Sequence, residues 1–471
     1  MKRSPEHAPL GEERARHLLA RTGFGAPPAE IAAIARLARE EAVDRLLEGL
    51  VDRASAPFPA WIDEPEPAPR DVQAMSVAER EAHQRRQRER GIELREWWLR
   101  EMLAGPSPLS ERLTLFWHGH FATSQRKVRS PRLMARQNAL LRRHAAGRFG
   151  DLLHGIARDP AMLIYLDGAG SRRGVPNENF AREVMELFTL GEGAYSERDV
   201  KEAARAFTGW GIDRESGEFR ERPALHDGGA KSVLGRTGRL RGGDVLDLLL
   251  ARPETADHLT RKLWREFISP VPEPAGVSRI AAVLRETGYD IRAWVRAALL
   301  SEPFWHPDNR ASLIKSPVDL VAGTLRTFGI RPFVLRPAAV ACAQLGQDLF
   351  GPPNVKGWPG AEHWINAATL LARKQLLERV FRGSDAMDSA PAMAATGAPG
   401  PEARMRRAME QGMRTYAFDP AVFAASIGAD ASARRVERLL LAQAAVHPVP
   451  EGLPVADLVR HFVADPAYQL R

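Results

Sequence analysis

Helical periodicity is the feature that most limits what this chain can fold into. Apolar residues recur three and four positions apart along most of it, as in APPAEIAAIARLAREEAVDRLLEGL (residues 26–50), and stretches that alternate apolar and polar residues are nearly absent. The first spacing places apolar side chains on one face of an α-helix, and alternation places them on one face of a strand. The sequence therefore predicts a mostly α-helical protein, a large multi-helix domain with at most a small β-hairpin near residues 217–235.

Capping residues mark where several of these helices begin. Ser130 and Asp159 each stand directly before a proline, the order expected for an N-cap followed by the first helical residue. Ser196 and Asp199 form a capping-box pattern before another apolar run. Together with composition, these boundaries predict a main domain and a C-terminal helical subdomain. The expected divisions are a main helical domain at 1–382 with a Pro-rich acidic loop at 52–73, a mobile low-complexity loop at 383–403, and the subdomain at 404–471.

The bulk composition is that of a soluble globular protein. Hydrophobic residues make up 44% and charged residues 27% of the 471 residues. No stretch approaches the roughly 18 consecutive apolar residues of a transmembrane helix. The basic first residues are not followed by an apolar stretch, so we predict no secretory signal in this sequence and a cytoplasmic location, unless the protein is exported with a partner. Cys342 is the single cysteine, which excludes an internal disulfide bond.

Many of the basic residues lie in one run. The formal net charge is +8, and residues 126–148 hold eight Arg and Lys residues with no acidic residue among them. Such a run is able to contact phosphates, but it lacks the interleaved aromatic residues that stack on single-stranded bases. Nucleic-acid binding through this run is therefore the weakest of our hypotheses. Mutual neutralisation with the acidic helix that follows in the sequence is the simplest expectation.

The stretch PNENFAREVMELFTLG (176–191) predicts a helix with one charged face. At 100° per residue its apolar side chains fall in one arc and its polar side chains in the other, within about 140°. The polar arc holds Glu178, Asn179, Arg182, Glu183 and Glu186. Clustered carboxylates raise one another's pKa and an intervening Arg lowers it, which suits acid–base chemistry or binding of a hard cation. The alternative is a solvated face with ion pairs four residues apart.

A second candidate is LTLFWHGHFATSQRKV (113–128), which places His118 and His120 on either side of a glycine. We consider both as ligands of a divalent metal, the one candidate cofactor. On a continuous helix the two imidazoles diverge by about 200°, so one metal binds both only if Gly119 breaks the helix. The sequence supplies no third ligand at fixed spacing. The alternative is a pair of buried histidines satisfied by backbone carbonyls.

Two further clusters contain ionisable residues in loops. HDGGAKSVLG (226–235) carries His226, Asp227 and Lys231 in a turn that either closes over a ligand or is a purely structural polar turn. GPPNVKGWPG (351–360) is a proline-stiffened loop with a lysine and a tryptophan. Such a loop suits ligand contact, and it also suits a wedge between helical layers.

These strings together resemble the large bacterial family DUF1800, whose members have no established reaction. The resemblance runs in order from His17 to the C-terminus, and it includes WHGHF, PNENFAREVMELFTLG, HDGGAKSVLG and GPPNVKGWPG. The usual first motif of the family is W-H-N-H-F, so this chain has Gly119 in place of an asparagine. The resemblance implies that many members are exported and that a sulfatase-like protein is a partner. It also favours an arrangement in which the four clusters meet in space.

Our leading hypothesis is an enzyme that performs metal-assisted or acid–base chemistry on an anionic substrate. The carboxylates and histidines would bind a divalent metal or share acid–base duties, and Arg182 and Lys231 would hold the anionic group. The alternative is a non-catalytic scaffold or export companion, in which the polar residues form sealed structural networks. The proposed pocket gathers His118, His120, Glu178, Arg182, Glu183, Glu186, His226, Asp227 and Lys231.

Overall fold

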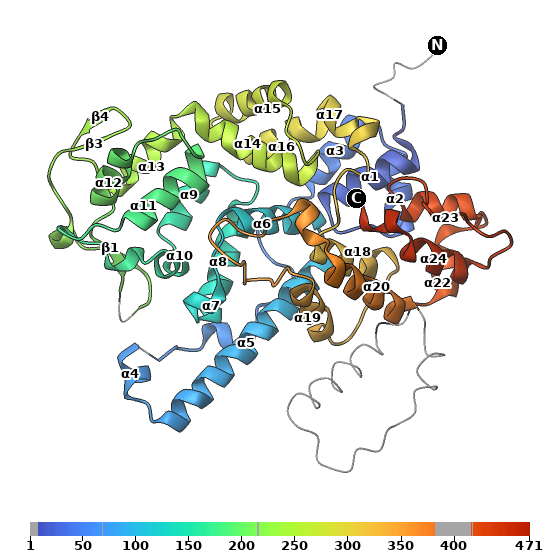
Figure 1. The fold of residues 1–471 in the computed structure, drawn as a ribbon, viewed down its shortest axis with the longest axis horizontal. Coiled ribbons are helices and arrows are strands. Elements are labelled where there is room, and N and C mark those ends of the chain that lie inside the picture. Colours follow the sequence, from blue (N-terminus) through green and yellow to red (C-terminus); the bar gives the residue numbers. More distant parts are fainter. Residues whose placement is uncertain (1–7, 68, 214–215, 382–415, 417) are drawn as a thin grey trace.

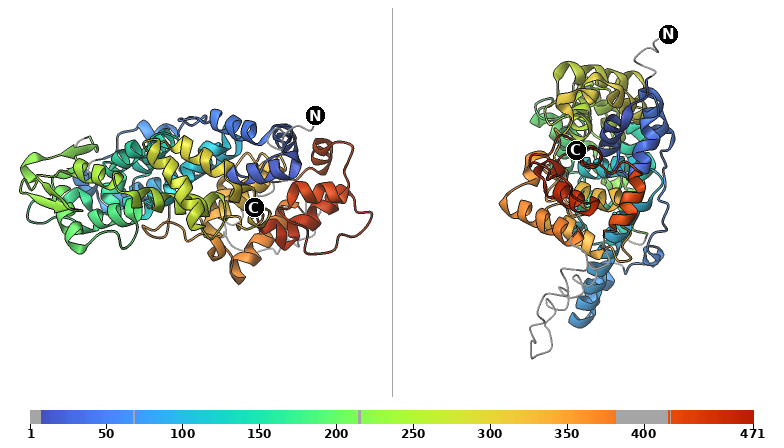
Figure 2. Two further views of the ribbon diagram at one scale, coloured as in Figure 1. Left: turned by 90° about the horizontal axis from the view of Figure 1, so that it is seen from above. Right: turned by 90° about the vertical axis from the view of Figure 1, so that its right-hand side faces the viewer.

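Helices form nearly all of the described structure, as the periodicity predicts. The computed structural model describes residues 8–67, 69–213, 216–381, 416 and 418–471. Within these residues the mostly α-helical prediction is confirmed, and extended strands are limited to two antiparallel pairs. Figures 1 and 2 show an elongated molecule with the strands at one end of its long axis and the last helices of the chain at the other.

The N-terminal part of the chain includes a long helix, α5, of 28 residues. Ser76 and Glu79 form a capping box that starts α5, and the C-terminal half of this helix buries Trp97 and Trp98 in the core. The stretch expected to be a Pro-rich acidic loop contains two short helices, η2 and the start of α4. The bounds are α1 (Gly11–Thr22), α2 (Pro28–Ala35), α3 (Arg39–Glu48), η2 (Ala60–Asp63), α4 (Pro69–Ala74) and α5 (Val77–Ala104).

The central helices begin where the capping residues predict. The Ser130 side chain accepts a hydrogen bond from the Leu133 backbone N–H, and Asp159 accepts one from Met162. Ser196 and Asp199 form the predicted capping box. The bounds are α6 (Pro108–His120), α7 (Gln125–Val128), α8 (Pro131–His144), α9 (Phe149–Ala157), α10 (Pro160–Tyr165), η3 (Gly168–Gly170), α11 (Glu178–Met185), the π-helical turn η4 (Glu186–Leu190) and α12 (Glu197–Ala206).

The small β element is confirmed, and it consists of two short sheets. Strand β1 (Trp210–Ile212) pairs with β2 (Phe219–Glu221), and β3 (Lys231–Val233) pairs with β4 (Arg236–Gly238), both antiparallel. The 3₁₀ turn η5 (Pro223–Leu225) separates the two pairs, so neither sheet extends into the other. The element thus begins earlier than the predicted range and folds as two ribbons, of which β3 packs against α12 and β1 packs against η3 and α10.

The remaining helices fall into two groups, residues 242–381 and residues 420–469. The second group packs against the first helices of the chain. Helix α23 contacts α1, α22 contacts α2 and α24 contacts α20. The bounds are α13 (Gly242–Leu250), α14 (Pro253–Phe267), α15 (Pro274–Glu286), α16 (Ile291–Leu300), α17 (Glu302–Trp305), η6 (Pro307–Asn309), α18 (Pro317–Thr327), α19 (Arg336–Gln344), η7 (Ala361–Trp364), α20 (Ala367–Phe381), α22 (Pro420–Ile427), α23 (Ala433–Leu440), α24 (Val455–Ala464) and η9 (Pro466–Gln469).

One continuous apolar core joins these groups. It extends from Leu10 to Tyr468 and includes the fully buried Trp117, Trp264 and Trp294. The loop predicted at 383–403 lies outside the described residues, so the structure neither supports nor opposes it. Among the described helices none has the length and apolar character needed to cross a bilayer.

Candidate functional site

A cavity of ≈350 Å³ lies between α6, α14, the start of α18 and the loop 351–360. We call it the Lys262 cleft. Its lining carries five cationic side chains and two carboxylates, with aromatic rings from Phe116, Trp358 and Trp364. The charged residues are Arg112, Lys262, Arg265, Lys356 and Arg471 against Glu266 and Asp319. The excess of positive charge suits an anionic ligand.

Lys262 is held in the cleft by a helix end and an imidazole. Its ammonium group donates to the Leu187 carbonyl at 2.9 Å and to Nδ1 of His120 at 3.1 Å. The Leu187 carbonyl belongs to the π-helical turn η4, where carbonyls at the end of a helix have no intrahelical partner and favour cations. An ammonium group has three donors. Within the described part of the chain no carboxylate pairs with Lys262, so its third donor is available to a ligand in the cleft.

His120 is neutral in this arrangement. Its Nε2 lies 3.2 Å from the Phe188 carbonyl and donates to it, which leaves Nδ1 to accept from Lys262. Burial, together with the neighbouring Lys262 and His258, brings the pKa of His120 well below its ordinary value. His258 contacts the same turn through the Leu187 carbonyl at 3.1 Å, and burial followed by Lys262 lowers its pKa to about 4. Two neutral imidazoles therefore accompany one ammonium group.

Burial also lowers the pKa of Lys262, to about 8, with a further contribution from Arg265. An amine with this pKa exists in both protonation states near neutral pH, which general acid–base catalysis requires. The cleft thus offers a proton donor or acceptor that is fixed in position and is paired with no carboxylate of the described residues.

His118 has different surroundings from His120. Helix α6 continues through His120, so the break at Gly119 that shared metal binding requires does not occur. His118 packs against Trp98, Phe350 and Trp358 with ring centroids 5.5 Å away, and burial lowers its pKa to about 3. Its Nε2 is enclosed and has no hydrogen-bond partner among the described residues. In the same part of the chain, no three His, Cys, Asp or Glu side chains lie close enough together to hold a metal ion.

The loop 351–360 rests on the carbonyl end of α6. Gly357 adopts φ 84°, and a Cβ atom there would lie 2.4 Å from the Gly119 carbonyl oxygen. A Cβ atom on Gly119 would meet only Trp358, at 4.0 Å, and this position lines the cleft. The WHGHF and GPPNVKGWPG strings are therefore in direct contact, and the absence of a side chain at Gly119 widens the cleft.

Replacing Gly357 with alanine should destabilise the protein by more than the ~1–3 kcal/mol that a strained backbone conformation costs, because the Cβ also collides with backbone. Gly360→Ala is the matched control, since Gly360 also has positive φ but open space around it. Thermal melting of both variants measures the difference. Equal melting temperatures would show that the loop is not seated on α6.

The acidic face of α11 approaches the rim of the cleft without lining it. Burial and Glu186 raise the pKa of Glu183, and Lys356 of the loop opposes this rise. Glu186 accepts a hydrogen bond from the Tyr195 hydroxyl. Arg182 pairs with Glu197 of α12 at 2.6 Å, not with a residue four positions away on α11. Glu178 is half-buried at the first turn of α11.

The HDGGAKSVLG cluster forms a network of its own against α12. Asp227 accepts from Arg205 at 2.8 Å, and Arg205 brings the pKa of Asp227 down to about 2. His226 Nδ1 lies 2.9 Å from the Thr208 carbonyl, and the buried Lys231 donates to the carbonyls of Asp227 and Gly229. These contacts fit the alternative that the cluster is a purely structural polar turn. Figure 1 shows β3 and β4 at one end of the molecule, away from α6 and α18.

The basic run 126–148 is paired in part with acidic residues outside α11. Four of its eight cations make such ion pairs, and Arg142 is fully buried against Glu111. The expected neutralisation by α11 is therefore wrong, because α11 turns its acidic face toward α12 and the loop 351–360. The pairs are Arg126–Asp348, Lys127–Asp167, Arg136–Glu218 and Arg142–Glu111.

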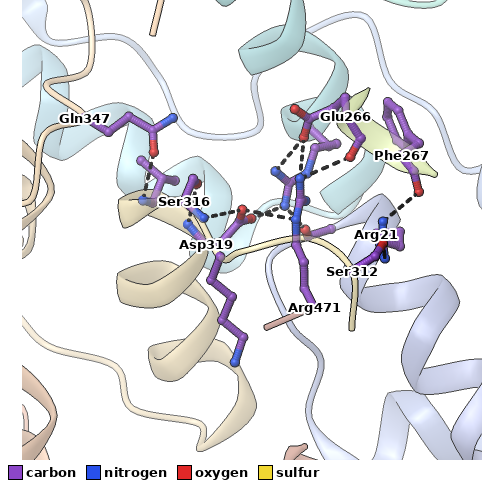
Figure 3. Close-up of polar contacts among 12 residues, drawn as sticks. Arg21, Glu266, Phe267, Ser312, Ser316, Asp319, Gln347 and Arg471 are labelled. Carbon is purple, nitrogen blue, oxygen red and sulfur yellow. Dashed lines mark hydrogen bonds and ion pairs between the residues drawn. The ribbon is translucent and has the colours of Figure 1, made fainter. Parts of the chain in front are cut away.

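The floor of the cleft is a buried charge network, shown in Figure 3. Asp319 at the first turn of α18 accepts a hydrogen bond from Arg112 and lies 3.5 Å from Nε of Arg471. Glu266 pairs with Arg112 at 3.2 Å and with Arg471 at 2.9 Å. The two carboxylates hold the two guanidinium groups in place, and the remaining cations of the cleft are left without partners of opposite charge on the floor.

The structure thus brings together His120 and the loop 351–360, with Glu183 and Glu186 nearby, and it leaves the HDGGAKSVLG cluster and His118 apart from the cleft. Sequence reasoning expected a helix at about 254–267 but missed the polar residues of α14 as candidates for the site. His258, Lys262, Arg265 and Glu266 recur at intervals of four, three and one, which places them on one face of that helix. This polar stripe opposite a buried apolar stripe was the signal available.

Comparison with known proteins gives one match. The family model described as Protein of unknown function (DUF1800) matches residues 17–470, nearly the whole chain. No curated protein matches the chain, and no solved structure matches it.

Proposed function

The chain belongs to the DUF1800 family of unknown function, and from its own residues we propose that it is an enzyme acting on a small anionic organic substrate in the Lys262 cleft. The observation that carries the proposal is the unpaired Lys262 ammonium, fixed by Leu187 and His120 at the wall of a cationic cavity. A buried cation without a counter-ion is costly in a protein interior. A bound anion would supply the missing partner.

Lys262 is the proposed acid–base group. Its third N–H would donate to the substrate anion, and in its neutral form the amine would remove a proton from the substrate. His120 and the Leu187 carbonyl take up two N–H groups of the Lys262 nitrogen. The third position, which faces the cleft, would carry a proton in the ammonium form and the lone pair in the neutral amine. The pKa of about 8 keeps both forms accessible near neutral pH.

Substrate recognition would combine charge with aromatic walls. Arg265 and Lys356 line the outer part of the cleft, and Lys356 lies 3.6 Å from Glu192 with most of its side chain in solvent. Trp358 and Trp364 offer flat apolar surfaces beside these cations. This combination suits a carboxylate or phosphate attached to an organic body.

The acidic residues of α11 have a proposed role at the rim. Glu183 interacts electrostatically with Lys356 and with its neighbour Glu186. These two carboxylates would hold the loop 351–360 against α11 or exchange protons with solvent. For Glu178, Arg182, His226, Asp227 and Lys231 the catalytic role remains a prediction, and the contacts described above support a structural one.

Reductive labelling with pyridoxal 5′-phosphate tests the proposal, because this probe joins an anionic group to an aldehyde that reacts with neutral amines. At pH 8 we expect peptide mapping after borohydride treatment to find Lys262 as the main labelled residue among the eight lysines of the chain. Pyridoxal without the phosphate should label it more weakly. Labelling spread over exposed lysines such as Lys201, with Lys262 unmodified and no effect of the phosphate, would contradict the proposal.

A competition series then narrows the substrate class. Organic phosphates and carboxylates that bind in the cleft should protect Lys262 from labelling, and neutral analogues of the same shape should not. Protection by neutral analogues alone would contradict recognition of an anion.

A further inference from the structure

A second cavity, separate from the opening of the Lys262 cleft, is lined by three cationic side chains. It measures ≈40 Å³ and lies between α1, α18 and the last residues of the chain. Arg16, Lys315 and Arg471 line it, together with Asp319 and the ring of Tyr468. Asp319 and Arg471 also belong to the floor of the cleft, so the two cavities share one wall.

Arg16 has no ion-pair partner within the part of the chain that the structure describes. Its side chain is 8% exposed, and it takes part in no hydrogen bond or ion pair with the described residues. Its Nε is enclosed without an acceptor. Glu13, the acidic residue whose charge it feels most, is paired with Arg310. A guanidinium group presents five N–H donors, so Arg16 lines the cavity with its donors unused.

Lys315 adds to the same imbalance, and Arg471, although paired with Glu266 and Asp319, keeps an unused donor. The Lys315 ammonium lies 3.6 Å from the centre of the Tyr468 ring and makes no hydrogen bond within the described residues. Burial lowers its pKa to about 7, with Arg16 acting in the same direction and Asp319 opposing it. Arg471 is 6% exposed, and its Nη1 is enclosed without an acceptor among these residues.

The carboxylates nearby do not compensate these charges. Asp319 has the one carboxylate side chain among the described residues that line the cavity, and it is already paired with Arg112 and Arg471. The buried Arg373 packs close by and donates to Gln469 and the Lys315 carbonyl, both neutral. Uncompensated buried charges of one sign are strongly unfavourable, whereas an anion among them receives charge-assisted hydrogen bonds.

We propose that this cavity is a binding site for a small inorganic anion, held by Arg16, Lys315 and Arg471. One water molecule needs about 10–15 Å³ of such space, so the cavity has room for an ion the size of chloride or phosphate but not for an organic substrate. The bound anion would tie α1 to α18 and to the last residues of the chain. It would also fix Arg471, which forms part of the floor of the Lys262 cleft.

Thermal melting in different potassium salts tests this site. At equal ionic strength, phosphate or chloride should raise the melting temperature of the wild-type protein by about 3 °C or more over gluconate, which is too large for the cavity. Arg16→Gln should lose this rise. Arg14→Gln, an exposed position on the same helix, should keep it. Lys315→Met, which retains an apolar stem beside Tyr468, provides a second test if Arg16→Gln does not fold.

Two results would overturn the proposal. One is that neither phosphate nor chloride changes the melting temperature relative to gluconate. The other is that Lys262→Met removes the rise while Arg16→Gln and Lys315→Met keep it, because the anion would then bind in the cleft and not in the second cavity.

Discussion

Replacing Asp319 with asparagine is expected to lower the free energy of unfolding by ~3–5 kcal/mol, the usual cost of removing one partner from a buried charge network. Asp319 is 4% exposed and contacts both Arg112 and Arg471. Asparagine keeps the size and one acceptor but leaves two buried guanidinium groups with Glu266 as their remaining acidic partner. Denaturant unfolding measures the loss.

Asp52→Asn is the control for this substitution, because the Asp52 side chain is 67% exposed. We expect it to change the unfolding free energy by no more than about 0.5 kcal/mol. A small effect at both positions would mean that Arg112 and Arg471 are neutralised by something other than Asp319.

The stability contributed by Asp319 should also depend on pH. Burial raises the pKa of this carboxyl group, but Arg112 and Arg471 outweigh burial and bring it down to about 2 from an ordinary value of 3.8. A depressed pKa gives stability that is complete above pH 3.8 and is lost as the pH falls toward 2. The difference between the wild type and Asp319→Asn should therefore shrink over this interval. A constant difference would show that the carboxylate charge is not what stabilises the fold.

Replacing Lys262 with methionine is expected to weaken binding of an anionic ligand in the cleft by roughly 10- to 150-fold, the range for losing a charge-assisted hydrogen bond. The ligand for this measurement is pyridoxine 5′-phosphate, which has the phosphate of the labelling probe but no aldehyde. Lys262→Arg, which keeps the charge, should bind it with affinity close to the wild type. Lys201→Met, an exposed position on α12, serves as the control and should have no effect.

The stability of Lys262→Met should remain within about 1 kcal/mol of the wild type, because no carboxylate among the described residues loses its partner. Loss of affinity accompanied by unfolding would assign Lys262 a structural role. Unchanged affinity for the ligand in a folded Lys262→Met variant would show that Lys262 does not contact the ligand.

The pH dependence of ligand binding distinguishes a contribution of Lys262 from contributions of the neighbouring histidines. Burial and Arg265 lower the pKa of Lys262 to about 8, and the other groups at its ammonium, His120 and His258, are already neutral at that pH. The charged amine is present below pH 8, so wild-type affinity should fall as the pH rises above it. Lys262→Arg should show no such fall.

The helices were predictable because their signals are local. Ser130, Asp159 and Ser196 start helices through contacts with residues two or three positions away, and these contacts depend on nothing outside the segment. The two β ribbons were predictable as a region but not as a pair, since they pack on different segments: β3 lies against α12, and β1 lies against η3 and α10. The helix starts that were expected from a local capping pattern therefore agree with the structure.

The candidate site was predictable in part, since its contacts join distant segments. His120 was identified from its own motif, but its partner Lys262 lies 142 positions later, on a helix whose polar stripe resembles an ordinary solvated face. The charges of HDGGAKSVLG suggested a ligand, and the structure instead pairs Asp227 with Arg205 and Lys231 with carbonyls of its own turn. Spacing in sequence does not reveal which charges find partners during folding.

The pKa of Lys262 is the most direct test of the account. With only eight lysines in the chain, NMR of ¹³C-methylated lysine side chains resolves individual titrations, and Lys262→Met identifies the signal by its disappearance. We predict a midpoint at about pH 8 that moves upward when an anionic ligand is added. A titration midpoint near the ordinary 10.5 that does not change when ligand is added would contradict the claim that Lys262 is a half-buried amine in a ligand site with no carboxylate partner among the described residues.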